Sequence, residues 1–349
     1  MTASLCPNLT EPETEKLLEK LRSGTQDRTD LKAALLLRGE PQQALFALAR
    51  ARREGCFPEN QVEIRSVIEL SNICHQSCKY CSMAKGSGIK RYMITKDAVL
   101  AMADFLYANG RRVILLQSGE NGSPNFVNFV TDCVQEIKTK HPEVEIILCL
   151  GNLTREQYQA LRAAGADRYV LKFETANEGF YADWKQTDTL PKRLECLETL
   201  LELGFKVGTG NMVGMPGQTL DHIVDDLMLV GKYNLAMMSC TVFIPGEACV
   251  FRDEPKGDVE TALNFIALMR ILYPSRLMPT TSCLEQAKPG GLLAGLMAGA
   301  NTVTMHDGTP EHFAALFPIY SSKRVTPNKG LVAEILAQAN LTAAPGPLR

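Results

Sequence analysis

Three cysteines, Cys74, Cys78 and Cys81, lie close together in the chain, directly after an apolar stretch, with the spacing C-x3-C-x2-C. Thiolates spaced in this way can hold three irons of a [4Fe–4S] cluster. No fourth cysteine follows in the same loop, so one iron would be left open to a ligand that the protein does not supply. An open iron predicts chemistry at the cluster rather than storage of an electron.

Zinc sites and disulfides also use clustered cysteines. A structural zinc site usually closes four ligands with paired C-x2-C hooks, and here the nearest candidate for a fourth ligand is His75. The chain has eleven cysteines, an odd number, and its N-terminus has neither the basic start nor the apolar core of a secretory signal. We therefore expect a reducing, cytoplasmic compartment, and a non-catalytic iron–sulfur or zinc-binding protein remains the alternative to an enzyme.

The composition favours a small-molecule substrate. The 349 residues carry a formal net charge of −2, with 45% apolar and 22% charged residues, and no extended basic block appears. Such a chain has no general attraction to nucleic acid or to an anionic membrane. No run is long enough to span a bilayer, so we expect neither nucleic acid nor membrane among its partners.

The elements that must position the cysteines form a repeated pattern of short apolar runs and longer amphipathic stretches. Eight runs predict strands, namely 64–70, 112–117, 144–150, 168–173, 205–211, 237–244, 277–282 and 301–305. Eight βα units predict an α/β fold, a (β/α)8 TIM-type barrel. We expect an N-terminal helical extension over residues 1–58, the barrel over 59–320, and a C-terminal tail and helix over 321–349.

Polar residues gather where the predicted strands end. Ser118-Gly119-Glu120 follows the second strand, Glu174 follows the fourth, and Thr280-Thr281 lies near the end of the seventh. In a barrel these positions converge on the mouth where active sites are built. Glu174 could accept hydrogen bonds from ribose hydroxyls, or make a salt bridge at the barrel rim. Arg193 could pair with a carboxylate, or lie on a solvated helix face.

The cysteine spacing after the first strand, with Tyr80 before the last cysteine, resembles the radical S-adenosylmethionine (radical SAM) superfamily. Within it, the chain resembles the HydE maturases of [FeFe]-hydrogenase assembly over residues 60–320. The segments that carry this resemblance are 69–74, 90–92, 116–120, 164–169, 174–177, 212–219, 243–245 and 279–281. The resemblance implies a radical SAM enzyme that uses the 5′-deoxyadenosyl radical on an iron–cysteine precursor bearing carbon monoxide and cyanide.

The resemblance also implies roles for single residues. Cys74, Cys78 and Cys81 would hold the cluster and carry catalysis. Contacts to S-adenosylmethionine would come from Tyr80, Ser118, Gly119, Glu120, Glu174, Arg193, Met212, Val213 and Ile244. The pocket for a small anionic substrate would be lined by Gln117, Arg168, Lys172, Thr280 and Thr281. The expected partners are that substrate, an electron donor such as flavodoxin or ferredoxin, and companion maturases.

The chain departs from the HydE pattern in two places. Lys172 stands where an arginine is expected. A single ammonium then replaces the two parallel hydrogen bonds of an arginine, so the resemblance specifies the substrate less closely at this position. No cysteine follows Cys283, whereas many relatives carry three more for a second cluster, so we expect one [4Fe–4S] cluster. A relative such as methylornithine synthase, acting on an amino-acid-derived substrate, is the alternative enzyme. His306-Asp307, after the last strand, is a further candidate at the mouth or a hydrogen-bonding pair of the loop.

Overall fold

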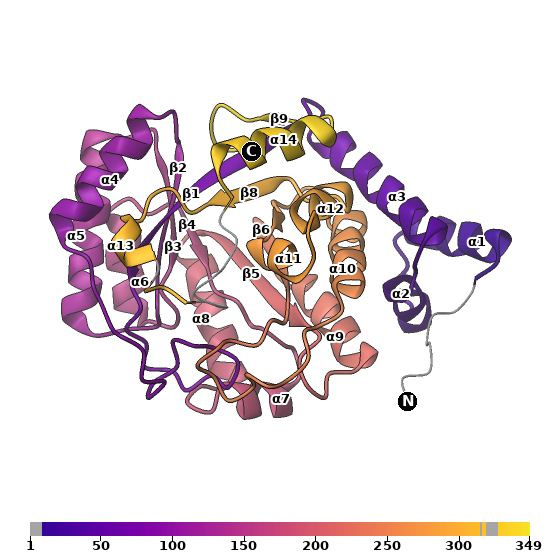
Figure 1. The fold of residues 1–349 in the computed structure, drawn as a ribbon, viewed down its shortest axis with the longest axis horizontal. Helices are drawn as coiled ribbons and strands as arrows, with labels where there is room; N and C mark the ends of the chain where they lie inside the picture. The colour runs from indigo at the N-terminus through magenta and orange to yellow at the C-terminus, as the bar shows by residue number, and fades with distance from the viewer. Residues whose placement is uncertain (1–8, 315, 319–326) are drawn as a thin grey trace.

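Eight parallel strands form the centre of the computed structural model, which describes residues 9–314, 316–318 and 327–349 (Figure 1). The strands are β1 Gln61–Ser71, β2 Val113–Ser118, β3 Glu145–Cys149, β4 Arg168–Val170, β5 Lys206–Val213, β6 Met237–Val242, β7 Pro279–Thr280 and β8 Thr302–Met305. They pair in the order β6-β5-β4-β3-β2-β1-β8-β7. A parallel bridge between Met237 and Leu277 joins the two ends of this order. The predicted barrel is therefore confirmed.

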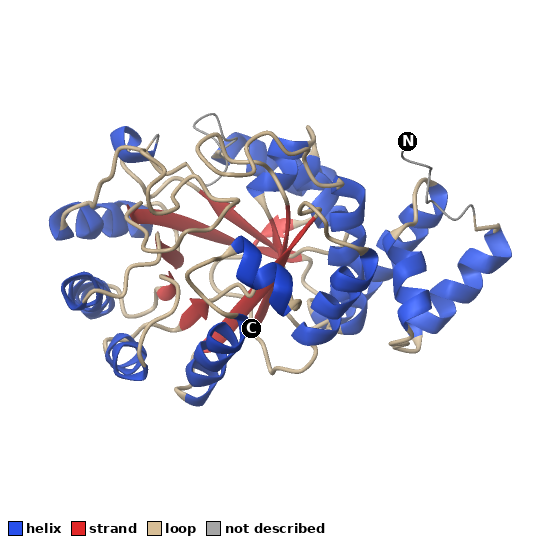
Figure 2. Cartoon of the chain, turned by 90° about the horizontal axis from the view of Figure 1, so that it is seen from below, coloured by secondary structure: helices blue, strands red, loops and turns tan. Residues whose placement is uncertain are grey.

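Helices follow most of the strands and surround the barrel (Figure 2). They are α4 Lys96–Ala108, α5 Pro124–Lys140, α6 Arg155–Ala163, α7 Glu178–Trp184, α8 Leu190–Glu202, α9 Leu220–Val230, α10 Val259–Leu272, α11 Ser282–Ala287, α12 Gly291–Met297 and α13 Glu311–Ala314. Several begin at a threonine whose hydroxyl accepts a bond from the first turn, as Thr154 and Thr189 do for α6 and α8. Among the residues that the structure describes, no helix is long and apolar enough to cross a bilayer.

Two strands, β4 and β7, are shorter than their apolar runs predict by three residues or more. β4 ends at Val170, and Glu174, whose φ of 65° is left-handed, forms only an isolated bridge to Asn211 of β5. β7 covers only Pro279 and Thr280, since proline donates no ladder bond and Ser282 begins α11. The short helices α7 and α11 lie within loops that the apolar pattern did not predict as helical.

Three helices precede the barrel and pack on its outside: α1 Glu11–Arg22, α2 Arg28–Leu35 and α3 Glu40–Cys56 (Figure 1). Arg28 of α2 pairs with Asp225 of α9 at 2.6 Å, and Gln42 of α3 donates to the Asn264 side chain of α10 at 2.9 Å. Leu31, Leu35 and Leu45 are fully buried. The predicted helical extension therefore lies over α9 and α10, away from the cysteine loop.

The chain's last described segment lies at the amino ends of the strands. It holds α14 Lys329–Gln338 and β9 Thr342–Ala343, which pairs in parallel with the start of β1. The Leu348 amide donates to the buried Glu63 carboxylate at 2.9 Å. The predicted boundary at 320–321 lies outside the described residues.

Buried charges close the same end of the barrel. Arg168, the first residue of β4, binds both Glu63 oxygens at 2.9 and 3.0 Å and Glu145 at 2.5 Å. Arg65 donates to Glu63 at 2.7 Å. Since the strands are parallel and these residues lie at or near their starts, the ion pairs form a floor, and the barrel opens toward the carboxyl ends of the strands.

Candidate active site

The cysteine loop leaves the end of β1 and is held in place by Arg91. The guanidinium of Arg91 donates to the carbonyls of Asn72 at 2.7 Å, Met83 at 2.9 Å and Ala84 at 2.7 Å. The Asn72 side chain in turn accepts from the Tyr92 amide at 2.8 Å. The two ends of the loop are therefore fixed to one planar group, which restrains the positions of the three thiols between them.

A second segment, residues 183–188 between α7 and α8, contacts the cysteine loop from the other side. The Lys79 amide donates to the carbonyl of Trp184 at 2.8 Å, and the Ser77 amide donates to the Thr187 hydroxyl at 3.0 Å. Lys185 is buried and lines the cavity, and its positive charge opposes the rise that burial causes in the pKa of Cys78. This segment brings positive charge to the loop.

Burial raises the pKa of the Cys78 thiol to about 11 and raises that of Cys81 further. Metal binding offsets such a cost, because bound irons stabilise the thiolate form. The Met83 amide points at the Cys81 sulfur at 3.4 Å, the kind of N–H···S contact that tunes cluster potentials. Within the described residues, no three His, Cys, Asp or Glu side chains are grouped to hold a single metal ion. In a cluster each cysteine binds a different iron, so the donor set is compatible with a cluster.

Gly119 follows β2 and contacts the cysteine loop. A Cβ at this position would lie 2.5 Å from the Ile73 carbonyl oxygen and 2.8 Å from Cys74 Cβ. The Gly119 amide donates to the carbonyl of Ser71 at 2.9 Å. The resemblance implies a contact between this glycine and S-adenosylmethionine, and the structure shows that its missing side chain first of all allows the cysteine loop to pack on β2.

Glu120 comes next and is held at the mouth by polar contacts. Its carboxylate accepts from Gln76 at 2.6 Å and from Arg193 at 2.9 Å. Gly151, after β3, leaves room for it, since a Cβ there would lie 2.1 Å from Glu120 Cγ. A half-buried carboxylate in this position can accept the hydrogen bonds of an ammonium group.

Arg193 of α8 is not on a solvated face, because only 2% of it is exposed. Besides Glu120 it contacts Asp188 at 3.0 Å and the Tyr181 hydroxyl at 2.9 Å. Burial works to lower its pKa, but the charges of Glu120, Tyr181 and Asp188 outweigh burial and hold the pKa above its ordinary value. The residue is therefore a fixed cation in the wall of the cavity, where a ligand carboxylate could share it.

Glu174 also lines the cavity, and its position is fixed through its backbone. Its amide donates to the Gly210 carbonyl at 3.0 Å, and its carbonyl accepts from the Met212 amide at 2.9 Å. The buried Asp226 accepts from the Ala176 amide at 2.6 Å and from Asn211 at 3.0 Å, which fixes the loop after Glu174. One Glu174 carboxylate oxygen, Oε2, is buried and lies 3.1 Å from the Lys172 ammonium. The Glu174 side chain is 12% exposed and lines the cavity, so its carboxylate can accept a hydrogen bond from a ligand hydroxyl.

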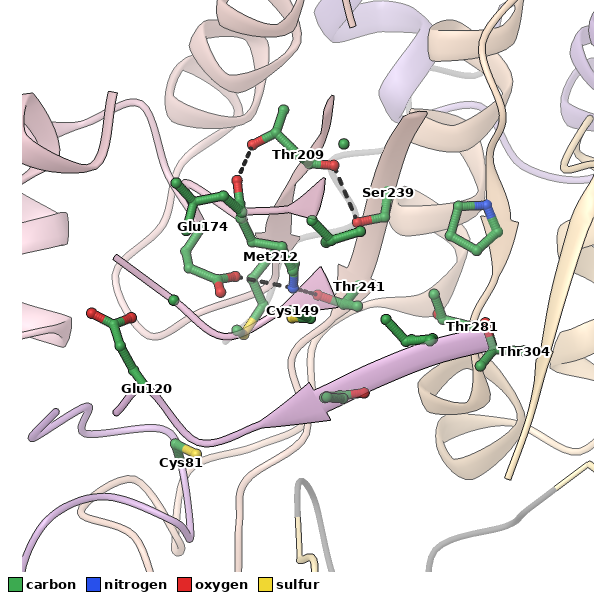
Figure 3. A pocket seen from close by; sticks show the side chains of 18 of the residues that line it. Cys81, Glu120, Cys149, Glu174, Thr209, Met212, Ser239, Thr241, Thr281 and Thr304 are labelled. Carbon is green, nitrogen blue, oxygen red and sulfur yellow. Dashed lines mark hydrogen bonds and ion pairs between the residues drawn. The ribbon is translucent and has the colours of Figure 1, made fainter. Parts of the chain in front are cut away.

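One cavity of about 350 Å³ joins these groups (Figure 3). Cys81 and Glu120 lie at one side of it, Thr281 and Thr304 at the other, and Glu174, Met212 and Thr241 between them. The predicted residues that line it are Cys74, Cys78, Tyr80, Cys81, Gln117, Ser118, Gly119, Glu120, Lys172, Glu174, Arg193, Met212, Ile244, Thr280 and Thr281. Segments more than 200 residues apart in the sequence, such as those of Cys74 and Thr281, thus meet at one site.

Two predicted residues do not line this cavity. Arg168 lies in the floor, where Glu63 and Glu145 occupy its guanidinium, because it begins its strand and so lies at the closed end. Val213 is 1% exposed and packs in the hydrophobic core, while its carbonyl accepts from the Phe243 amide. The structure therefore does not bring the side chains of Arg168 and Val213 to this cavity, and their contacts with substrate and cofactor stay predictions.

Other lining residues were not predicted as site residues. They include Arg65, Cys149, Lys185, Ser239 and Thr241. Ser239 and Thr241 alternate along β6, and this period of two marks the inward face of a strand once its neighbours are known. Thr241 accepts from the Lys172 ammonium at 3.0 Å, which steadies that cation beside the substrate space.

Comparisons with known proteins agree with this site. A family model described as the radical SAM superfamily matches residues 68–230. The chain is 37% identical over 311 residues to the [FeFe] hydrogenase maturase subunit HydE of Thermotoga maritima, covering 88% of each chain. It is 30% identical over 265 residues to biotin synthase 2 of Frankia casuarinae, covering 74% of this chain and 73% of that one.

Solved structures resemble it in fold. Methylornithine synthase (PylB) superposes with a TM-score of 0.81 at 21% identity, covering 94% of this chain and 97% of that one. The maturase HydG of Carboxydothermus hydrogenoformans superposes with a TM-score of 0.77 at 19% identity, covering 95% and 79%. The chain therefore belongs to the radical SAM superfamily, as a HydE-like enzyme whose family implies a [4Fe–4S] cluster, S-adenosylmethionine and a reductant.

Proposed function

We propose that this enzyme acts on a small anionic substrate in the barrel, and that this substrate is an iron–cysteine precursor bearing carbon monoxide and cyanide. The observation that carries the proposal is the single cavity shared by the cysteines, the Glu120–Arg193 pair and the Lys172–Thr280–Thr281 group. The relative from Thermotoga maritima is a maturase subunit of [FeFe] hydrogenase, and it covers most of this chain.

In this proposal Cys74, Cys78 and Cys81 hold one [4Fe–4S] cluster, since no cysteine follows Cys283 in the sequence. When bound, the cluster and S-adenosylmethionine supply a 5′-deoxyadenosyl radical to the cavity. An electron donor such as flavodoxin or ferredoxin reduces the cluster, companion maturases pass on substrate and product, and the reaction takes place in the reducing cytoplasm.

The chain's own groups orient S-adenosylmethionine. Glu120 accepts hydrogen bonds from the ammonium of S-adenosylmethionine, and Arg193 donates to the carboxylate of the same molecule. The two side chains give one wall of the cavity charges that are complementary to those of the cofactor. Glu174 lines the cavity and accepts hydrogen bonds from the ribose hydroxyls. Tyr80, Met212 and Ile244 line the cavity and give the adenine an apolar surface, with Ser118 and Gly119 beside the methionine end.

The substrate occupies the remaining space of the cavity. Lys172 is half-buried, and although burial opposes its charge, Glu174 keeps its pKa above the ordinary value, so it stays a cation. Thr281 and Gln117 add hydrogen-bonding groups, while the Thr280 hydroxyl already donates to the Leu292 carbonyl at 2.8 Å. A cation with hydroxyl neighbours suits a carboxylate or an anionic metal complex.

The test is anaerobic reconstitution with S-adenosylmethionine, reductant and the candidate iron–cysteine complex. We expect an adenosylated product from wild type, and a loss of at least about tenfold for Lys172→Met, since a hydrogen bond to a charged group contributes about 1.5–3 kcal/mol. Lys192→Met, on the exposed face of α8, is the matched control and should behave as wild type.

Cleavage of S-adenosylmethionine without any adenosylated product would contradict the proposed substrate. It would favour the alternative, a methylornithine-synthase-like enzyme that acts on an amino-acid-derived substrate. Equal activity in the Lys172 and Lys192 variants would remove Lys172 from the substrate contacts.

A further inference from the structure

His306, directly after β8, lines the cavity and is paired with a buried carboxylate. Its Nδ1 lies 3.1 Å from Oε1 of Glu69 on β1. The side chains are 8% and 0% exposed. The two residues are 237 positions apart, and only the closure of β1 on β8 brings them together. The roles assigned above to the cluster, cofactor and substrate contacts use neither residue.

The backbone around this pair is fixed on both sides. The Glu69 amide donates to the Thr309 hydroxyl at 2.8 Å, and the Tyr92 hydroxyl donates to the Glu69 carbonyl at 3.0 Å. Asp307, next to His306, pairs with Arg111 at 3.1 Å. The imidazole is therefore held from two elements and is not a freely rotating side chain of a loop.

The pairing decides which ring nitrogen faces the substrate. A carboxylate only accepts hydrogen bonds, so the Nδ1 of His306 carries the proton in this contact. In the neutral ring, Nε2 then keeps its lone pair, and no hydrogen bond joins it to a residue that the structure describes, so it is the nitrogen we assign to a molecule in the cavity. A carboxylate behind an imidazole also stabilises the imidazolium that forms when Nε2 takes up a proton.

We propose that His306 is a catalytic residue that binds the substrate and exchanges a proton with it, and that Glu69 is the residue that positions the imidazole. The substrate class is then one that carries a dissociable amino, hydroxyl or thiol hydrogen beside its anionic group. In the step, the Nε2–H bond forms while the substrate N–H, O–H or S–H bond breaks, leaving its electron pair on the substrate atom. The proton returns to the product later, so no oxidant or reductant is needed. This role rests on the proposed function of the same cavity.

The first experiment compares the holoenzyme with His306→Asn, which retains a group able to donate to Glu69 but lacks Nε2. Conversion of the iron–cysteine complex should show a kcat at least about tenfold lower, the scale of general acid–base catalysis, with KM changed much less. The control is His141→Asn, since His141 and Asp104 form a histidine–carboxylate pair outside the cavity, at 2.8 Å.

Glu69 is tested by a conservative pair of variants. Glu69→Gln should lower kcat, and Glu69→Asp should recover part of the loss, because it restores the charge and not the length. A purely structural role would make both variants lose stability without this order in kcat. Equal kcat in Glu69→Gln and wild type would overturn the positioning role.

The second experiment does not need the right substrate. Diethyl pyrocarbonate reacts with a free imidazole lone pair, so mass spectrometry of the labelled holoenzyme should find His306 modified, and Glu69→Gln should slow this modification. An unmodified His306 beside a modified, exposed His312 would overturn the proposal. If wild type cleaves S-adenosylmethionine but does not convert the iron–cysteine complex, the proposed substrate fails, and the labelling alone decides the role of His306.

Discussion

Gly151 gives the sharpest test of how the site is built, because it makes room for Glu120. Its φ is +84°, and an alanine Cβ would lie 2.1 Å from Glu120 Cγ and 2.3 Å from Cδ. The Gly151 carbonyl accepts from the Tyr169 hydroxyl at 2.8 Å and the Tyr158 hydroxyl at 3.2 Å, so the backbone is restrained. In Gly151→Ala the Glu120 side chain must therefore move.

The matched control is Gly204→Ala, since Gly204 has a φ of +77° and no atom lies within 4 Å of the place that an alanine methyl group would take. Both variants should lose about 1–2 kcal/mol in the free energy of unfolding, because an alanine is strained in the left-handed backbone conformation. Only Gly151→Ala should also lose the contact between Glu120 and the cofactor ammonium. A hydrogen bond to a charged group contributes about 1.5–3 kcal/mol, which corresponds to a dissociation constant raised by about 10- to 150-fold.

Isothermal titration of S-adenosylmethionine into the reconstituted variants, under anaerobic conditions, measures this difference. Thermal unfolding of the same samples checks that the two alanines destabilise the fold alike. If Gly151→Ala binds S-adenosylmethionine as tightly as Gly204→Ala, Glu120 does not hold the cofactor and its assignment is refuted.

Three further predictions concern the supports of the site. Replacing Arg91 by lysine should lower the iron retained after reconstitution, because one ammonium cannot reach all three carbonyls of the cysteine loop; Arg112→Lys, outside the loop, should retain its iron. Burial raises the pKa of Asp226 to about 8, so the folded state holds its proton at a pH where the unfolded chain has lost it. Asp226 therefore has little effect on the free energy of unfolding near its unfolded pKa of 3.8. As pH rises it lowers this free energy by up to about 1.4 kcal/mol per pH unit, and the effect levels off above pH 8. The free energy of unfolding of Asp226→Asn relative to wild type, measured with urea, should therefore increase between pH 6 and pH 8. Arg168→Met should cost up to about 3–5 kcal/mol by breaking the buried ion pairs of Arg168 with Glu63 and Glu145, yet leave the affinity for S-adenosylmethionine unchanged, which titration and urea unfolding would check together.

The sequence predicted the barrel well, because each strand is an apolar run and each βα unit repeats the pattern. All eight predicted strands occur, most within one or two residues of their expected ends. The exceptions are the start of β1 and the end of β4, which lie three residues from their expected positions, and β7 is only two residues long. The left-handed Glu174 follows a shortened β4, and Pro279 limits β7, which depends on tertiary contacts that an apolar run does not encode.

Sequence motifs predict which residues gather near the site, but not which end of the barrel each side chain faces or what covers it. Arg168 was expected in the substrate pocket, but as the first residue of β4 it faces the closed end beside Glu63. Arg193 allowed two interpretations, since helical spacing does not show whether a side chain is covered by α7 and the loop that follows it. The pairing of His306 with Glu69 joins the first and last strands and appears only when the barrel closes.

The central claim is that the cysteine loop and the cavity form one site with one cluster that cleaves S-adenosylmethionine. The most direct measurement is the iron content and the yield of 5′-deoxyadenosine from anaerobic, reduced wild type and from Cys78→Ala. Cys133→Ala, a buried cysteine of α5 outside the cavity, is the control. We expect about four irons per chain and 5′-deoxyadenosine from wild type and the control, with both lost in Cys78→Ala. Full iron content and undiminished 5′-deoxyadenosine in Cys78→Ala would contradict the account.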